Sequence, residues 1–298
     1  MVEIPSHLVE VPCALCRRSE YRVKFRSPWT RYPQQLEHFC ATTDHYGNYG
    51  RIVTCNFCGL VYTNPRPAEQ ELLDSYNRVE DREYLEEDAS RSINAYLSLN
   101  TIKQFVRKGK LLDVGCSTGY FLNAARLDFD VHGVEPSHWA AQFAKERLKL
   151  DILTGTLEEA RFPAQHFDVV CMSDVIEHLA GPLTSLQEIH RVTKTGGLLY
   201  LVTPDIDSPT ARILRSKWWG LRPAHLYYFS AKTLRALLDK AGFDVIMEKS
   251  YGRVFSCGYW LSRLKNYPRW IQTSARWFIQ RFQISNKVVY INTMDSLE

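Results

Sequence analysis

The sequence lacks any run of eighteen apolar residues, although 45% of its 298 residues are hydrophobic. No segment is therefore expected to cross a membrane as a helix. The opening "MVEIPSHLVEVPC" also lacks the basic and apolar regions of a secretory signal. Several of the eight cysteines form C-x-x-C pairs, which favours metal binding in a reducing compartment over disulfide bonds. We therefore expect a cytoplasmic location.

Acidic residues are absent from positions 250–294, and charge is distributed unevenly along the chain. Residues 210–298 carry 15 Lys and Arg against 5 Asp and Glu, whereas residues 61–209 carry 15 against 23. Trp270 and Trp277 lie seven positions apart in the basic part, so a helix would place them on one face. This stripe fits a helix that covers the sheet or the active site, or an interfacial helix on an anionic membrane. The same basic surface could receive a diphosphate or an RNA backbone.

Two cysteine pairs stand near the N-terminus, Cys13 with Cys16 and Cys55 with Cys58. Four thiolates in two such turns are a usual ligand set for a structural zinc ion. The 38 residues between the pairs exceed the usual spacing, so a loop or hairpin must fold over the site. A redox dithiol is the alternative. We predict a zinc-ribbon-like module over residues 1–65.

The middle of the chain contains the run "KLLDVGCSTGYFLNAARLDFDVHGVEPS". Its apolar segments predict buried strands at Leu111–Val114 and Val131–Val134, with a glycine turn and a helix between them. Gly115 and Gly119 allow backbone N–H groups to approach a ligand. Glu135, at the tip of the second strand, is placed to accept both hydroxyls of a ribose. The run therefore predicts a nucleoside site.

This glycine turn, with Asp113 ahead of it, resembles motif I of class I S-adenosylmethionine-dependent methyltransferases. "FDVVCMSDVIEHL", "LTSLQEIHRVTKTGGLLYLVTPD" and "AKTLRALLDKAGFDVIMEKS" resemble later segments of that family in the same order. The resemblance implies an α/β fold, with a Rossmann-like, doubly wound sheet of seven strands. Residues 66–109 would form a helical linker or cap, and residues 110–298 the methyltransferase domain, with a basic aromatic insertion at about 251–286. "KVVYIN" (Lys287–Asn292) is the expected last strand, and "TMDSLE" is the alternative.

The resemblance also implies a binding site for S-adenosylmethionine. The glycine turn and Cys116 would line the methionine part, and Asp113 would organise the turn. Glu135 would bind the ribose, Leu157 would border the adenine, and Ser173 would offer its backbone to the amino-acid part. The expected cofactor residues are Asp113, Gly115, Cys116, Gly119, Glu135, Leu157 and Ser173.

The stretch "DVIEHL" follows the fourth strand of this sheet, at the edge where such folds carry out their chemistry. On a helical turn, Asp174, Glu177 and His178 would share a face. His225, in "RPAHLYYFS", follows the fifth strand. These four are the expected catalytic residues, and their donor atoms could also bind a second metal such as Mg or Mn.

A similar turn with Glu and His occurs in small-RNA 3′-end 2′-O-methyltransferases, which bind a metal there, and in ubiquinone-pathway O-methyltransferases. In this sequence the leading acid is Asp174 rather than Glu. Three interpretations therefore stay open. A metal could activate an acceptor hydroxyl, His178 or His225 could act as a general base, or Glu177 and His178 could cap the next helix.

The cysteine module joined to such a core resembles methyltransferases of bacterial glycan and natural-product pathways. This implies O-methylation of a sugar hydroxyl on a phosphate-linked or lipid-linked acceptor, with peripheral contact to the inner membrane face. Metal-assisted RNA 2′-O-methylation is the second hypothesis, because a zinc module and a basic third permit it. A non-catalytic, zinc-containing binding protein is the third. The sequence predicts no particular oligomeric state.

Overall fold

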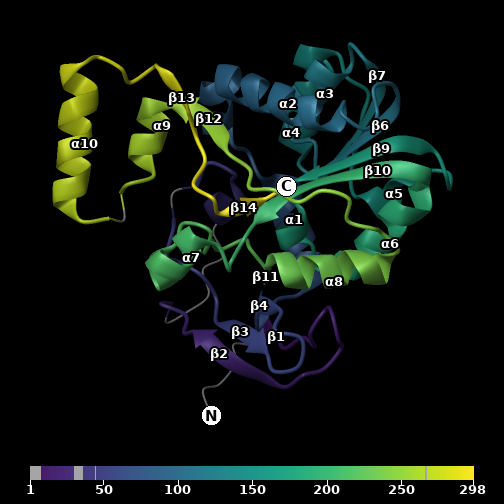
Figure 1. The fold of residues 1–298 in the computed structure, drawn as a ribbon, viewed down its shortest axis with the longest axis horizontal. Helices are drawn as coiled ribbons and strands as arrows, with labels where there is room; N and C mark the ends of the chain where they lie inside the picture. Colours follow the sequence, from purple (N-terminus) through teal and green to yellow (C-terminus); the bar gives the residue numbers. More distant parts are fainter. Residues whose placement is uncertain (1–7, 30–35, 44, 266) are drawn as a thin grey trace.

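The computed structural model describes residues 8–29, 36–43, 45–265 and 267–298. A six-stranded sheet forms its centre, in the order β14-β10-β9-β6-β7-β8 (Figure 1). Its strands are β6 (Gly109–Val114), β7 (Phe129–Glu135), β8 (Ile152–Thr154), β9 (Phe167–Ser173), β10 (Thr193–Pro204) and β14 (Ser296–Leu297). All neighbours are parallel except β14, which runs antiparallel to β10. The chain order reverses on either side of β6, where such sheets bind ligands.

Helices cover both faces of this sheet (Figure 1). Leu111 and Leu112 of β6 point to opposite faces, because side chains alternate along a strand. Leu111 packs in one apolar cluster with the first helix group, and Leu112 in another with the second. The first group is α2 (Asp88–Ile102), α3 (Tyr120–Ala125) and α4 (His138–Leu148), and the second is α5 (Leu157–Ala160), α6 (Pro182–Val192) and α8 (Ala231–Ala241). The expected doubly wound α/β fold is confirmed.

The last strand of the sheet differs from the expected one. Residues 288–291 form β13 (Val288–Ile291), which pairs with β12 (Arg253–Ser256) in a separate two-stranded sheet. The backbone of Lys287–Asn292 is therefore used in a hairpin, and β14, within "TMDSLE", takes the antiparallel edge. Ser250 forms only a bridge to Leu297, so the described residues give six strands rather than seven.

The hairpin β12–β13 carries two helices, α9 (Cys257–Ser262) and α10 (Arg269–Arg281), away from the sheet. Figure 1 shows α10 standing apart from the rest of the chain. Within the described residues, no helix combines the length and the apolar character needed to span a bilayer.

The N-terminal cysteine segment shares a sheet with the methyltransferase-like part. That sheet has the order β11-β4-β3-β2, and β11 (Tyr227–Tyr228) comes from beyond β10. Cys13, Leu15 and Leu60 pack in the same apolar cluster as Leu112. The described parts therefore share a core, and the domain boundaries at 65 and 109 remain predictions. The other N-terminal elements are β1 (Leu8–Val9), β2 (Tyr21–Phe25), η1 (Leu36–Phe39), β3 (Ile52–Cys55), β4 (Val61–Thr63), β5 (Arg66–Pro67), α1 (Glu69–Arg78) and η2 (Arg82–Glu87).

Candidate functional site

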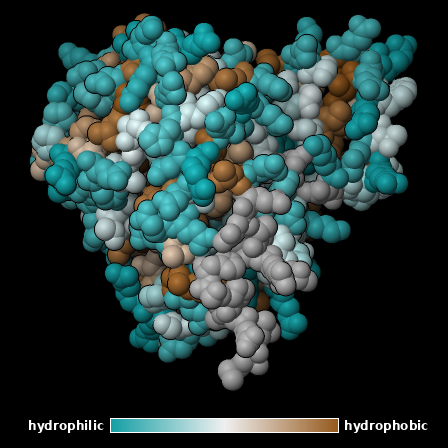
Figure 2. Space-filling model, turned by 180° about the vertical axis from the view of Figure 1, so that it is seen from behind, coloured by the Kyte–Doolittle hydropathy of each residue, from teal (hydrophilic) through white to brown (hydrophobic). Residues whose placement is uncertain are grey.

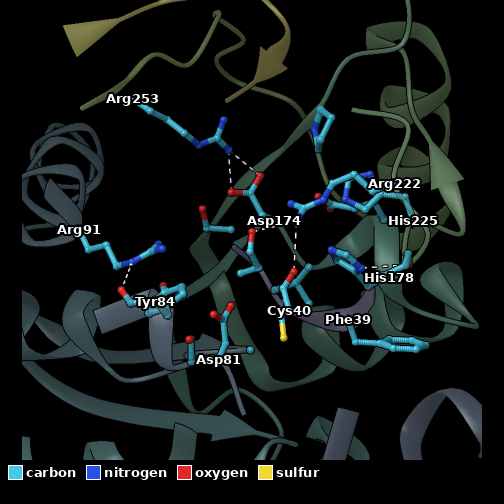
Figure 3. Close-up of a pocket in the computed structure, with 18 of the residues that line it drawn as sticks. Phe39, Cys40, Asp81, Tyr84, Arg91, Asp174, His178, Arg222, His225 and Arg253 are labelled. Carbon is cyan, nitrogen blue, oxygen red and sulfur yellow. Dashed lines mark hydrogen bonds and ion pairs between the residues drawn. The ribbon is translucent and has the colours of Figure 1, made fainter. Parts of the chain in front are cut away.

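A cavity of about 1410 Å³ opens at the carboxyl ends of β6, β7, β9 and β10. Figure 3 shows part of its lining. Pockets for a single small ligand usually measure about 300–1,000 Å³. This cavity is therefore large enough for two ligands side by side, such as a cofactor and an acceptor.

The turn after β6 forms one wall of the cavity. Gly115 has a φ of 72°, and a Cβ atom there would lie 2.6 Å from Cγ2 of Val175. The amides of Gly115 and Cys116 donate to the carbonyl of Val134 at 2.9 and 3.1 Å. The turn therefore needs a glycine at its start, and it is held tightly against β7.

Glu135 joins this turn to the tip of β7. Its Oε2 accepts a hydrogen bond from the amide of Ser117 and its Oε1 one from the amide of Ser137, both at 2.8 Å. Burial raises the pKa of Glu135 to about 7, although the two amides act in the opposite direction. Each carboxylate oxygen keeps a further lone pair. Glu135 can therefore still accept two hydroxyl groups from a ligand in the cavity.

The expected cofactor residues lie together, with one exception. The cavity is lined by Asp113, Gly115, Cys116, Glu135, Leu157 and Ser173. Gly119 does not line it. At Gly119, a φ of 82° begins α3, and a Cβ atom would lie 2.6 Å from Cδ1 of Leu150. This glycine allows close packing beneath the turn, and its contact with the cofactor remains a prediction.

Three of the expected catalytic residues also meet at the cavity. Donor atoms of Glu177, His178 and His225 all lie within 4.8 Å of one another. Glu177 and His178 belong to η3 (Ile176–His178), and the two imidazole rings meet edge to face with centroids 4.7 Å apart (Figure 3). The amide of Leu226 donates to the carbonyl of Glu177 at 2.8 Å. We call these three residues the donor cluster.

Hydrogen bonds leave electron pairs directed into the donor cluster. Nδ1 of His178 lies 3.1 Å from the carbonyl oxygen of Ala224 and 2.7 Å from the hydroxyl of Tyr76. Because a carbonyl only accepts, we assign the proton to Nδ1 and the lone pair to Nε2. Oε2 of Glu177 accepts from the hydroxyl of Thr203 at 3.0 Å. Oε1 of Glu177 and Nδ1 of His225 are buried and have no partner among the described residues.

Burial also sets the charges of the donor cluster. It lowers the pKa of His178 to about 4, helped by the positive charge of Arg222, and it lowers the pKa of His225 well below its usual value. Burial and the negative charge of Asp174 raise the pKa of Glu177 to about 8. Both imidazoles are therefore neutral near pH 7 and can act as electron-pair donors.

Asp174 is not part of the donor cluster, which corrects the expected set of four. Its backbone has a φ of 54°, and both carboxylate oxygens accept from Nη2 of Arg253 at 2.6 Å (Figure 3). Nη1 of Arg253 donates to Ser296 at 3.0 Å. This ion pair joins the end of β9 to β12. Arg253 and Tyr76 were not expected at the site, because nothing in their spacing relates them to "DVIEHL".

The donor cluster fits a divalent metal ion. Two imidazole nitrogens and one carboxylate oxygen match the two-histidine, one-carboxylate ligand set. A metal ion would also supply a partner for Oε1 of Glu177 and Nδ1 of His225, which form no hydrogen bond within the described residues. Imidazole suits Mn, Fe or Zn, whereas Mg prefers oxygen ligands and water. The Mg or Mn ion expected from the sequence remains a prediction.

The four paired cysteines also lie together. Sγ of Cys13 is 3.4 Å from that of Cys58, and Sγ of Cys16 is 3.4 Å from that of Cys55. All four are free thiols whose sulfur atoms lie within 4.8 Å of one another. Burial raises the pKa of Cys55, but amides of the second cysteine turn outweigh it and bring the value to about 7. Four such sulfurs fit a tetrahedral zinc ion, whose presence remains a prediction.

Thr63 connects the cysteine segment to the donor cluster. Its hydroxyl donates to the carbonyl of His225 at 3.0 Å, and its amide donates to the carbonyl of Leu226 at 2.8 Å. Thr63 ends β4, which follows the second cysteine turn and pairs with β11. The position of His225 therefore depends on the fold of the cysteine segment.

Comparisons with known proteins agree with this geometry. A family model described as a methyltransferase domain matches residues 82–248, more than half of the chain. A ubiquinone biosynthesis O-methyltransferase of Cereibacter sphaeroides is 30% identical over 164 residues, covering 51% of this chain and 66% of that protein. A tRNA U34 carboxymethyltransferase of Desulfotalea psychrophila is 32% identical over 149 residues, covering 46% of each.

Among solved structures, an S-adenosylmethionine-dependent methyltransferase from Archaeoglobus fulgidus has a TM-score of 0.50 and 18% identity. The match covers 73% of this chain and 97% of that one. This likeness concerns the fold. Together with the matched family and the cavity at the strand ends, it shows that the chain belongs to the methyltransferase domain family and has the class I fold of S-adenosylmethionine-dependent methyltransferases.

Proposed function

We propose that this protein transfers a methyl group from S-adenosylmethionine to a hydroxyl of a phosphate-linked sugar. The observation that carries the proposal is a single cavity lined by both Glu135 and the donor cluster. The similarity to a ubiquinone biosynthesis O-methyltransferase supports transfer to oxygen. The acceptor is inferred from the chemistry of the cavity.

Transfer needs a hydroxyl oxygen aligned with the sulfonium methyl. As the new O–CH₃ bond forms, the C–S bond breaks and the hydroxyl proton must leave. His178, with its neutral ring and a lone pair on Nε2, is placed to accept that proton. If Glu177, His178 and His225 held a divalent metal instead, the metal would take up that lone pair and lower the pKa of a bound hydroxyl, whose proton would then pass to water. The unpartnered Oε1 of Glu177 and Nδ1 of His225 favour this metal-assisted form, because buried acceptors without partners are costly.

Arg91 supports an acceptor that carries phosphate. It lines the cavity together with Arg222 and Arg253, but Arg222 donates to the carbonyls of Cys40, Ala41 and Thr43, and Arg253 donates to Asp174 (Figure 3). Nε of Arg91 donates to the carbonyl of Tyr84 at 2.8 Å, and its guanidinium lies 3.2 Å from the centre of the Tyr84 ring. Its Nη atoms donate no hydrogen bond within the described residues. A planar guanidinium held in this way suits phosphate recognition.

Replacing Glu135 with alanine should weaken S-adenosylmethionine binding by about 1.5–3 kcal/mol, because two charge-assisted hydrogen bonds to the ribose would be lost. Titration calorimetry measures this change. Asp130→Ala is the matched control, since Asp130 lies on the same strand at an exposed position and does not line the cavity. Equal affinities in the wild type and Glu135→Ala would contradict the assignment.

The His178 ring should stay neutral on acidification to about pH 5, because its lowered pKa is about 4. The unfolded chain takes up this proton near pH 6.5, so the contribution of His178 to stability is lost as the pH falls from about 6.5 towards 4. Nuclear magnetic resonance of labelled histidines, with His178→Gln for assignment, follows the ring directly. Titration of His178 near pH 6.5 would show that the ring is not buried as described.

A screen with methyl-labelled S-adenosylmethionine tests the acceptor class. It should compare phosphate-linked sugars, free sugars, phenols and RNA. We expect methyl incorporation into phosphate-linked sugars, and a lower KM for these than for the free sugars. Incorporation into RNA alone would replace the proposal with 2′-O-methylation of RNA. Cofactor binding without transfer to any hydroxyl would favour a binding protein.

A further inference from the structure

Helix α10 carries an exposed aromatic surface. The exposed fractions are 70% for Trp270, 63% for Trp277, 51% for Phe278 and 57% for Phe282. We call these four residues the aromatic stripe. No residue of α10 is buried. The stripe therefore does not cover the sheet, because α10 stands away from it (Figure 1).

The stripe is accompanied by positive charge alone. Arg269, Arg276 and Arg281 lie on α10, and none of them forms an ion pair within the described residues. No acidic residue occurs between positions 250 and 294. Val288 and Tyr290 of β13, which follows α10 in the chain, are also 45% and 57% exposed. Aromatic side chains flanked by arginines match the boundary between lipid headgroups and acyl chains.

The inner side of α10 faces the cavity. Ala275, Phe278 and Ile279 line the same cavity as Glu135 and the donor cluster. Phe278 is therefore both part of the exposed stripe and part of the lining. Figure 2 shows, from behind, hydrophobic side chains in the projecting part of the molecule. The stripe therefore adjoins the cavity that also contains the donor cluster.

We propose that α10 docks on an anionic membrane surface and that the acceptor is a lipid-linked sugar phosphate, which reaches the donor cluster between α10 and the sheet. The choice of acceptor rests on the proposed function, whereas the docking does not. The positive charge of the surface favours an anionic membrane over a second copy of this chain. A second copy of this surface would bring arginines against arginines, whereas anionic headgroups are complementary to them. The aromatic rings then enter the headgroup region.

Flotation of the full chain with vesicles tests the docking. Vesicles of phosphatidylcholine with phosphatidylglycerol should float the protein, vesicles of phosphatidylcholine alone should float much less, and added salt should weaken the binding. Two double variants should each bind vesicles less: Trp270→Ala/Trp277→Ala and Arg276→Glu/Arg281→Glu. We expect the partition coefficient of each to fall on the order of tenfold. The matched controls are Leu127→Ala/Ile213→Ala, at two positions that are both 78% exposed, and Arg107→Glu/Arg147→Glu. These should bind as the wild type does.

Two results would overturn the docking proposal. One is failure to float with anionic vesicles while the protein remains folded by circular dichroism. The other is binding to RNA that both stripe variants lose and that competes with vesicles, which would assign the surface to nucleic acid. Flotation requires no catalysis, so its failure is distinguishable from a failure of the proposed function. Normal methylation of soluble sugar phosphates without flotation would contradict the docking proposal and leave the proposed function standing.

Discussion

Replacing His178 with alanine should slow methyl transfer by about a hundredfold or more at saturating S-adenosylmethionine. The change removes the lone pair on Nε2 and the hydrogen bonds of Nδ1 to Tyr76 and Ala224. Cofactor affinity should stay within about twofold of the wild type, because the hydrogen bonds of His178 go to Tyr76 and Ala224 and those of Glu135 to Ser117 and Ser137. Single-turnover rates with labelled cofactor measure the loss, and calorimetry measures the affinity.

Variants of the other residues separate the metal-assisted form from a simple base. If a metal is bound, Glu177→Gln and His225→Ala should lose it together with activity, and elemental analysis should find metal in the wild type beyond the zinc of the cysteines. Asp174→Asn is the control, since Asp174 lies outside the donor cluster and should leave the metal content unchanged. A base alone predicts no such metal, and full activity after a chelation that leaves the zinc of the cysteines in place. If the turnover of His178→Ala stays within about threefold of the wild type, both the metal-assisted mechanism and the general-base mechanism are contradicted.

Replacing Cys13 and Cys55 together with serine should abolish zinc binding and strongly destabilise the chain. Structural zinc contributes about 10 kcal/mol or more of apparent binding free energy in small zinc modules. Both cysteines are buried in the same apolar cluster as Leu112. The loss of stability should therefore extend beyond the N-terminal segment to the central sheet. Elemental analysis and thermal unfolding measure the two effects. Cys40→Ser is the control, because Cys40 lies outside the four-sulfur group.

A subtler variant tests the connection from the cysteine segment to the donor cluster. Thr63→Val removes the hydrogen bond to the carbonyl of His225 and leaves the cysteines in place. A buried hydrogen bond contributes about 0.5–1.5 kcal/mol, so we expect roughly a threefold to tenfold lower kcat with full zinc content. A full complement of zinc in Cys13→Ser/Cys55→Ser would contradict the zinc site. An unchanged kcat in Thr63→Val would show that His225 is positioned without this contact.

The local parts of the site were predictable because their chemistry lies within a few residues. Gly115 and Glu135 stand at the ends of neighbouring strands, and Glu177 and His178 are adjacent in the chain. Parallel strands bring their carboxyl ends to one edge, which also placed His225 near them. Six of the seven expected cofactor residues line the cavity for the same reason.

The remaining parts depend on contacts between distant segments. Asp174 was expected among the catalytic residues, but Arg253 pairs with it from 79 positions away. Gly119 has the backbone conformation expected of a turn, and its missing side chain makes room for Leu150. The last strand was misplaced because the apolar pattern at 288–291 is the same whether it pairs with β10 or with β12. Periodicity shows that a segment can be a strand and leaves its partner open.

Methyl transfer to a sugar phosphate and to its series of monodeoxy analogues tests the central claim most directly. We predict that transfer from S-adenosylmethionine is lost when one particular hydroxyl is removed and kept when any other is removed. The product should carry the methyl group on that oxygen, and His178→Ala should lower its formation about a hundredfold. Transfer that survives the removal of every single hydroxyl, or a methyl group found on nitrogen or carbon, would contradict the account.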